Sequence, residues 1–158
     1  MNVRSEEEVT VKVLTPEEFQ QLLDALDSSD IWAVRNYWLL VLFWHTGLRV
    51  AEMVGLNCGD VADHNGQPRT RFGVRPEIAK GHRSDGWVAL NTAARKAVSE
   101  ILAFNRRYGF SVAPGAPLFT TRKHTRMSVR SVQVLIQQLR EGPISACPVP
   151  PMYYATVS

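Results

Sequence analysis

The segment 30–46 is apolar on nearly every side, and this constrains the fold more than any other feature of the chain. A helix with apolar residues around its whole circumference has to be buried in a larger core. Its large apolar residues are Trp32, Trp38, Leu39, Leu40, Leu42, Phe43 and Trp44. The apolar stretch 31–48 is interrupted by Arg35, Asn36 and His45 and is too short to span a bilayer. We therefore expect a central core helix, in a chain of 158 residues that is long enough to bury an ordinary core.

Helices are also predicted on both sides of this core segment. Thr15 and Glu18 have the spacing of a capping box, and Pro16 stands at the first helical position. Apolar residues then follow with the spacing of one helical face: Phe19, Leu22, Leu23 and Leu26. This pattern predicts an amphipathic helix that ends near Asp27. A short third helix is expected over 50–56, directly after the core helix.

The hydrophobic period changes in the middle of the chain. From residue 60 to residue 90, β-favouring segments alternate with turn residues. We expect strands over 71–79 and 87–90, joined by a tight loop over 80–86. Because the connection is short, the two strands should pair in an antiparallel sheet.

Two further amphipathic helices are predicted beyond the strands. The first is capped by Asn91 or Thr92 and is stopped by Gly109. Its predicted core face is Ala94, Ala97, Val98, Ile101 and Leu102. The second is capped by Ser128, and its predicted core face is Val132, Leu135, Ile136 and Leu139. The fold class is therefore mainly α with a small antiparallel β-sheet, an α+β arrangement.

The ends of the chain differ from its middle. Residues 1–14 are polar, and residues 15–141 carry all the predicted elements. Residues 142–158 contain four prolines and show neither helical nor strand periodicity. Prolines at that density exclude a helix across the segment, so we expect an extended or disordered tail.

The net charge of +3 hides an asymmetry along the chain. Residues 1–59 contain four Lys and Arg against nine acids, a formal charge of −5, whereas residues 60–158 contain fourteen against six, a formal charge of +8. A basic half favours a partner with a phosphate backbone. Charge alone is nearly as consistent with a solvated basic face.

Neither a metal site nor a cofactor is expected. The only cysteines, Cys58 and Cys147, form no ligand pair, and the four histidines are scattered. The N-terminus lacks the basic and apolar pattern of a secretory signal, so we expect a cytoplasmic protein without a membrane role.

The most informative motif is Thr-Gly-Leu-Arg at residues 46–49, followed by the acidic Glu52. It closely resembles the first arginine motif of the tyrosine recombinases, the phage integrase family. Gly47 lets the core helix end sharply, so Arg49 can present its planar guanidinium to a phosphate. Glu52 falls one helical turn later and can hold that guanidinium in place. Arg49 is thus a candidate catalytic residue with Glu52 as its support, although the two residues alone would also fit a surface ion pair.

A second motif begins at Lys80, where Lys-Gly is followed by polar residues and a valine-containing strand. It resembles the β-hairpin of the same family, whose tip lysine contacts DNA beside the cleavage point and can protonate the leaving 5′ oxygen. Lys80 is the matching catalytic candidate, and Arg83 in the same loop is a candidate DNA contact. Taken alone, this motif is equally typical of a solvated hairpin.

The third motif is Pro-Leu-Phe-Thr-Thr-Arg at residues 117–122, followed by a turn and a helix. Tyrosine recombinases often carry a similar motif before a helix that lies against DNA. The predicted DNA-binding stripe has helical spacing and consists of Arg126, Arg130, Gln133 and Gln137. Arg122 and Lys123 extend the positive charge into the preceding loop. Arg and Gln can contact phosphates and base edges, and the alternative is a solvated helix face.

The resemblance covers residues 15 to about 140 and implies a chemistry. Recombinases of this family cut DNA without a metal, by attack of a tyrosine on the scissile phosphate. Arginines and a histidine or tryptophan stabilise the charge on the transferring group. Arg49 and Lys80 match two of these positions.

The chain departs from the family pattern after the last predicted helix. The expected His-x-x-Arg motif is absent, and Tyr153 and Tyr154 come too soon to match the nucleophile. The separate N-terminal DNA-binding domain of the family is not expected either. We therefore expect a DNA-binding remnant of a recombinase that does not cleave alone, with double-stranded DNA as partner and with self-association or partner recombinase subunits as further possibilities. Two alternatives stay open: an active recombinase completed by another chain or a missing segment, and a helical protein-interaction module.

Overall fold

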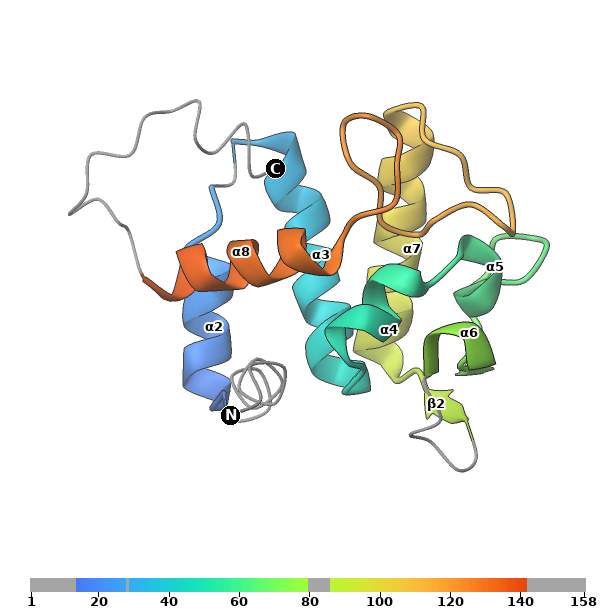
Figure 1. Cartoon of the computed structure of the whole chain (residues 1–158), viewed down its shortest axis with the longest axis horizontal. Helices are drawn as coiled ribbons and strands as arrows, with labels where there is room; N and C mark the ends of the chain where they lie inside the picture. The colour runs from blue at the N-terminus through green and yellow to red at the C-terminus, as the bar shows by residue number, and fades with distance from the viewer. Residues whose placement is uncertain (1–13, 28, 80–85, 142–158) are drawn as a thin grey trace.

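The computed structural model describes residues 14–27, 29–79 and 86–141, which form a helical assembly with one small sheet (Figure 1). In chain order the elements are α2 (Pro16–Asp24), α3 (Ile31–Thr46), α4 (Val50–Gly55), α5 (Cys58–Val61), β1 (Arg71–Gly73), α6 (Pro76–Ala79), β2 (Trp87–Ala89), α7 (Thr92–Arg107) and α8 (Val129–Arg140). β1 and β2 pair antiparallel, with Phe72 opposite Val88. The predicted fold class is confirmed: mainly α with a two-stranded antiparallel sheet.

The core helix lies where the sequence predicts it. α3 begins after Asp30, whose side chain accepts a hydrogen bond from the backbone N–H of Trp32, and ends at Gly47 in a left-handed turn with φ 69°. Leu39 and Leu42 are completely buried. α3 packs along α7, which buries the predicted face of that helix (Figure 1). The burial of apolar side chains from both helices supplies the main driving force for this packing.

The first amphipathic helix has the predicted start. Thr15 Oγ1 accepts the backbone N–H of Glu18, and Glu18 Oε1 accepts that of Thr15, at 3.1 and 2.9 Å. This capping box satisfies donors that a helix N-terminus leaves open. Phe19 stacks on Trp44 of α3 with ring centroids 4.6 Å apart, which holds α2 against the core.

The expected strand over 71–79 is wrong in its second half. β1 covers only Arg71–Gly73, and α6 forms a helical turn over Pro76–Ala79. Proline at the first position of a helical turn is favourable because it needs no backbone N–H there. The β-favouring residues before it predicted an extended segment that the proline interrupts.

The last helix, α8, packs across other helices of the structure. Ser128 caps α8 by accepting the backbone N–H of Ser131 at 3.0 Å, and Val132, Leu135 and Ile136 are buried. α8 contacts both α2 and α4 and crosses in front of α3 in Figure 1. Among the described elements, none is a helix long and apolar enough to cross a membrane. The calls on the N-terminal segment and the proline-rich tail fall on residues outside the described ranges, apart from Leu14.

Candidate nucleic-acid interface

Arg49 stands at the junction of α3 and α4. Gly47 turns the chain after α3, and Arg49 is the N-cap residue of α4, with an extended backbone at φ −74° and ψ 157°. The residue is half-buried. The predicted sharp end of the core helix is therefore present, and Arg49 lies where the next helix begins.

Glu52 is held in the first turn of α4. Its side chain is 2% exposed, and Oε1 accepts the backbone N–H of Arg49 at 3.0 Å. The sequence predicted that this carboxylate holds the guanidinium. The bond at Oε1 goes to the main chain of Arg49, so Glu52 caps the helix and fixes the backbone from which the arginine side chain departs.

The hairpin that carries the second motif is described only at its base. Lys80 and Arg83 lie outside the described residues. In the two described strands, Arg71 of β1 lies over the ring of Trp87 of β2, with its guanidinium carbon 4.8 Å from the ring centroid. Trp87 is 53% exposed, so the base of the hairpin presents an arginine and an aromatic ring on its outer face.

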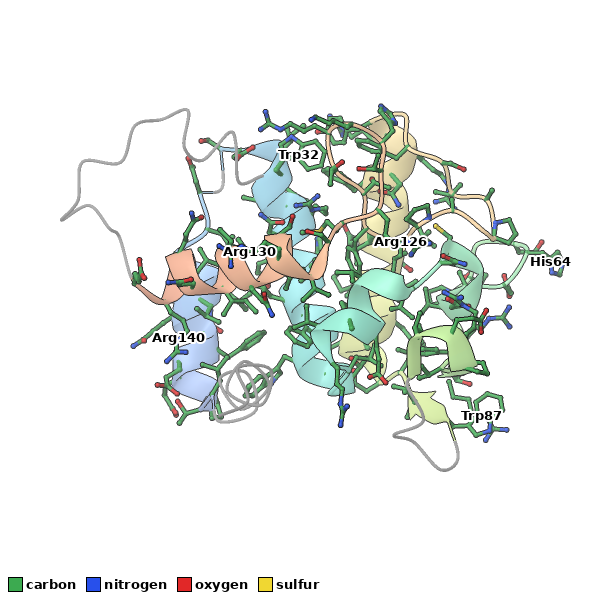
Figure 2. All side chains as sticks on the ribbon, in the orientation of Figure 1. Trp32, His64, Trp87, Arg126, Arg130 and Arg140 are labelled. Carbon is green, nitrogen blue, oxygen red and sulfur yellow. The ribbon has the colours of Figure 1, made fainter. Side chains whose placement is uncertain are left out.

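α8 presents part of the predicted polar stripe. Arg130 and Gln137 are exposed and Gln133 is half-buried, while the apolar residues of α8 face the core. Gln137 Nε2 donates to Glu141 Oε2 at 3.3 Å, one turn further along. Figure 2 shows Arg130 and Arg140 on α8. On α8 the stripe thus consists of the exposed Arg130 and Gln137 and the half-buried Gln133, and Arg140 near the end of the helix is exposed as well.

Arg126 departs from this stripe. It lies before the helix begins, and its Nη1 donates to the backbone carbonyls of Val54 and Leu56 at 3.0 and 2.9 Å. Its Nη2 donates to Asn57 Oδ1. Figure 2 shows Arg126 beside α4. The helical spacing suggested a shared face with Arg130, but the helix starts only at Val129 and these acceptors draw Arg126 toward α4.

The loop before α8 lies over the N-terminal end of the core helix. The guanidinium of Arg122 lies 5.5 Å from the centroid of the Trp32 ring, and Lys123 is exposed. Arg35 also faces this ring at 4.9 Å and donates to the backbone carbonyl of Thr120. The pKa of Arg35 is lowered to about 10, chiefly by burial; the charge of Asp30 raises it and the nearby charge of Arg122 lowers it.

Sequence reasoning missed the role of Arg35 in placing this loop. The available signal was a single arginine in a helix that is mostly apolar. A buried guanidinium needs acceptors nearby, because an unpaired charge is very costly in a protein interior. The acceptor on Thr120 lies far along the chain, so its identity was beyond the local pattern.

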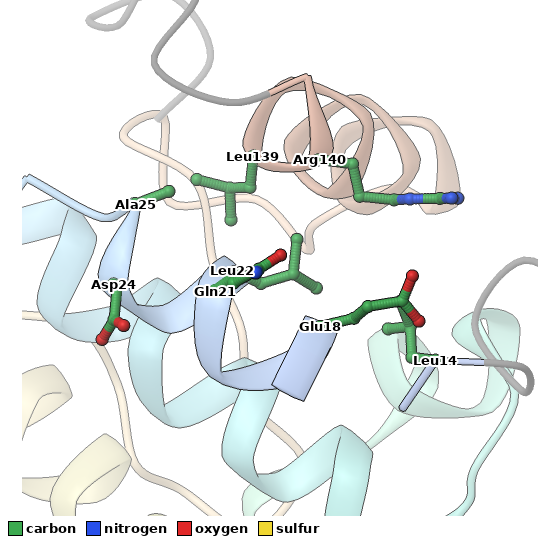
Figure 3. A pocket seen from close by; sticks show the side chains of 8 residues that line it. All are labelled: Leu14, Glu18, Gln21, Leu22, Asp24, Ala25, Leu139 and Arg140. Carbon is green, nitrogen blue, oxygen red and sulfur yellow. The ribbon is translucent and has the colours of Figure 1, made fainter. Parts of the chain in front are cut away.

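A groove of about 600 Å³ lies between α2 and α8 (Figure 3). Its lining residues are Leu14, Glu18, Gln21, Leu22, Asp24, Ala25, Leu139 and Arg140. Two carboxylates against one guanidinium make this groove a poor site for phosphate. Within the described ranges, no three His, Cys, Asp or Glu side chains gather as a metal site.

A model described as the phage integrase family matches residues 12–145. The chain belongs to the phage integrase family. The matched residues include the arginine motif, the hairpin segment, the loop before α8 that contacts Trp32, and α8 itself.

Curated proteins similar to this chain are named tyrosine recombinases. XerC of Caldanaerobacter subterraneus subsp. tengcongensis is 31% identical over 125 residues, which are 79% of this chain and 31% of that protein. XerC of Vibrio campbellii is 35% identical over 77% of this chain and 36% of its own length. XerD of Halalkalibacterium halodurans is 32% identical over 60% of this chain and 29% of its own length. The chain thus spans about a third of these relatives.

A solved structure, the crystal structure of XerA recombinase, has a similar fold. It aligns with a TM-score of 0.58 and 22% identity, over 81% of this chain and 41% of that chain. The mainly helical arrangement with its small sheet is therefore similar to part of the fold of XerA recombinase.

Proposed function

We propose that this chain binds double-stranded DNA through the α4 start, the hairpin and the exposed side of α8. The proposal rests mainly on the position of Arg49 at the N-cap of α4 in a chain of the phage integrase family. The helix α4 in turn contacts α8. Phosphate contacts come from arginines and lysines on these elements and give most of the affinity.

The residues have distinct proposed roles. Arg49 binds a phosphate with its planar guanidinium. Lys80 and Arg83 contact the backbone from the hairpin. On α8, Arg130 contacts a phosphate or base edge, and Gln133 and Gln137 contact base edges.

The loop before α8 is proposed to contribute weaker contacts. Lys123 is exposed and can reach a phosphate directly. Arg122 is exposed as well, and its stacking on Trp32 holds the guanidinium near the surface with less loss of side-chain entropy on binding.

Cleavage by these 158 residues alone is not part of the proposal. They contain Arg49 and Lys80 but no His-x-x-Arg sequence. A catalytic set that acts as a unit loses orders of magnitude in rate when one member is missing. The alternative is that another chain or segment completes the active site.

The binding proposal is tested with matched charge-removing variants. Arg130→Gln removes a proposed contact, whereas Lys96→Gln removes one charge from an exposed position on α7. Duplex affinity measured by fluorescence anisotropy should fall about 5- to 50-fold for Arg130→Gln, the range for one charged contact, and less than twofold for Lys96→Gln. Equal losses in both variants would indicate a general charge effect and contradict a site on α8.

Cleavage is tested separately on a nicked suicide duplex. We expect no covalent protein–DNA adduct on denaturing gels. An adduct that maps to Tyr153 or Tyr154 would overturn the proposal that the chain binds without cutting. Absence of any duplex binding would instead favour a helical protein-interaction module.

A further inference from the structure

The C-terminal end of α4 is held by two arginines from different parts of the chain. Arg126 Nη1 donates to the carbonyls of Val54 and Leu56, and Arg75 Nη2 donates to the carbonyl of Gly55. The last carbonyls of a helix lack partners within the helix, and cations there interact favourably with the helix dipole. α4 has only six residues, too few for a helix to be stable by itself, so such contacts matter more than in a long helix.

Side chains after α4 link the two arginines. Arg126 Nη2 donates to Asn57 Oδ1, and the backbone N–H of Asn57 donates to Asp60 Oδ2 at 2.8 Å. The carboxylate of Asp60 also forms an ion pair with Arg75 at 3.0 Å. We call Arg75, Arg126, Asn57 and Asp60 the α4 clamp.

Asp60 interacts with both positive charges of the clamp, Arg75 and Arg126. Partial burial and the nearby positive charge of Arg75 lower the pKa of Arg126, and Asp60 opposes this shift. A guanidinium nevertheless stays protonated at neutral pH. The negative charge of Asp60 therefore offsets the repulsion between two arginines that bind adjacent carbonyls.

The clamp connects the α4 start with the segments that lead to the hairpin and to α8, the three principal elements of the proposed DNA interface. Arg49 immediately precedes α4. Arg75 lies five positions before Lys80, with only α6 between them, and Arg126 lies two positions before Ser128, the N-cap of α8. A shift of α4 would therefore change the position of Arg49 relative to both other segments.

We propose that Arg126 and Arg75 are positioning residues that act through Arg49. They fix the short helix α4, and with it the backbone of Arg49, against the hairpin segment and the start of α8. This inference rests on the proposed DNA binding. It replaces the sequence-based prediction that Arg126 contacts DNA, because the bonds from both of its terminal nitrogens end on protein acceptors.

A double-mutant cycle distinguishes positioning from direct contact. Arg126→Met keeps much of the aliphatic stem and removes the donors, and Arg49→Ala removes the group that is positioned. Each single variant should weaken duplex binding about tenfold, the loss expected for one charge-assisted hydrogen bond. In the Arg49→Ala background, Arg126→Met should add less than about twofold, because coupled residues are not additive.

The salt dependence gives a second readout of the same cycle. The slope of log affinity against log salt should change by about one for Arg49→Ala and by no more in the double variant. Arg122→Gln serves as a matched control, since Arg122 lies in the same loop and is proposed to touch DNA directly. The effects of Arg122→Gln on affinity and on the salt slope should add to the effects of Arg49→Ala.

Additive losses, with a slope change of about two in the Arg126–Arg49 double variant, would show direct contact and overturn the inference. A lower melting temperature with unchanged affinity would overturn it too, because the role would be structural only. If Arg126→Met fails to fold, Asn57→Ala removes one bond of the clamp and should show the same coupling on a smaller scale.

Failure of the proposed function has a different signature. A wild-type chain that binds no duplex would overturn the proposed DNA binding. In that case, hydrogen exchange of the backbone amides would test whether the clamp stabilises α4. The α4 amides should exchange faster in Arg126→Met while the α7 amides do not. Unchanged α4 exchange would overturn the clamp as well.

Discussion

Arg35 shows how one charged residue in an apolar helix can organise a distant loop. It is 1% exposed, and its donors reach Thr120 O and Asn36 Oδ1 while its guanidinium faces Trp32. These contacts fix the start of the loop that carries Arg122 and Lys123. The sequence identified Arg35 only as an interruption of the core helix, because its carbonyl partner lies 85 positions away.

Arg35→Met should lower the free energy of unfolding by about 1–3 kcal/mol, because it leaves the buried carbonyl of Thr120 without its donor. Val34→Met on the exposed side of the same helix should change it by less than about 0.5 kcal/mol. Urea denaturation followed by circular dichroism measures both. An Arg35→Met protein as stable as the wild type would mean that burial of the cation costs as much as its contacts contribute.

Cys58 should be an unreactive thiol. It is 2% exposed, and burial raises its pKa to about 11, above the usual 9.0. In a Cys147→Ser background, alkylation of Cys58 at pH 8 should be much slower than in the urea-unfolded chain, because the thiolate is the nucleophile. Rates that match in the folded and unfolded chains would contradict the burial.

The sign of the pH effect follows from the same raised pKa. The unfolded thiol loses its proton near pH 9.0, while the folded thiol keeps it to about pH 11. The contribution of Cys58 to stability is therefore complete below pH 9.0 and is lost as the pH rises toward 11.

At the scale of single elements, helix starts were predictable and the contacts between elements were not. The capping box at Thr15 and Glu18 is local, so its residues specify it directly. The predicted strand over 71–79 failed because Pro76 begins a helical turn inside a β-favouring segment. The hydrogen bonds of Arg126 to α4 were also not predictable, since their carbonyl acceptors lie 70 and 72 positions away.

The turn between α3 and α4 depends on the backbone freedom of Gly47. Its φ of 69° is left-handed, and an added Cβ would meet nothing within 4 Å. Gly47→Ala should therefore cost about 1 kcal/mol through backbone strain alone. Gly115 offers the matched control, because its surroundings are equally open and its φ is not left-handed.

Thermal or urea unfolding measures the stability of the Gly47→Ala and Gly115→Ala variants. Gly115→Ala should leave stability unchanged or raise it slightly, because alanine restricts the unfolded chain. Equal effects of the two substitutions would contradict a stability cost specific to the left-handed turn at Gly47.

For the whole molecule, the sequence predicted the fold class and the family resemblance, and both are confirmed. The spacing of apolar residues along the helices predicted the core, and the Thr-Gly-Leu-Arg motif was the main basis of the family resemblance. The hairpin candidates Lys80 and Arg83 and the stripe on α8 stay predictions. The α4 clamp required three-dimensional contacts, because Arg75 and Arg126 lie about 20 and 70 positions along the chain from the α4 carbonyls that they bind.

The proposed DNA binding is tested most directly by the salt dependence of duplex affinity for the wild-type chain. Six cationic contacts, from Arg49, Lys80, Arg83, Arg122, Lys123 and Arg130, predict a linear fall of log affinity against log salt with a slope of about −5. Fluorescence anisotropy between about 50 and 200 mM salt covers the range over which such contacts weaken strongly. A slope near zero, or no binding at the lowest salt, would contradict the proposed DNA interface.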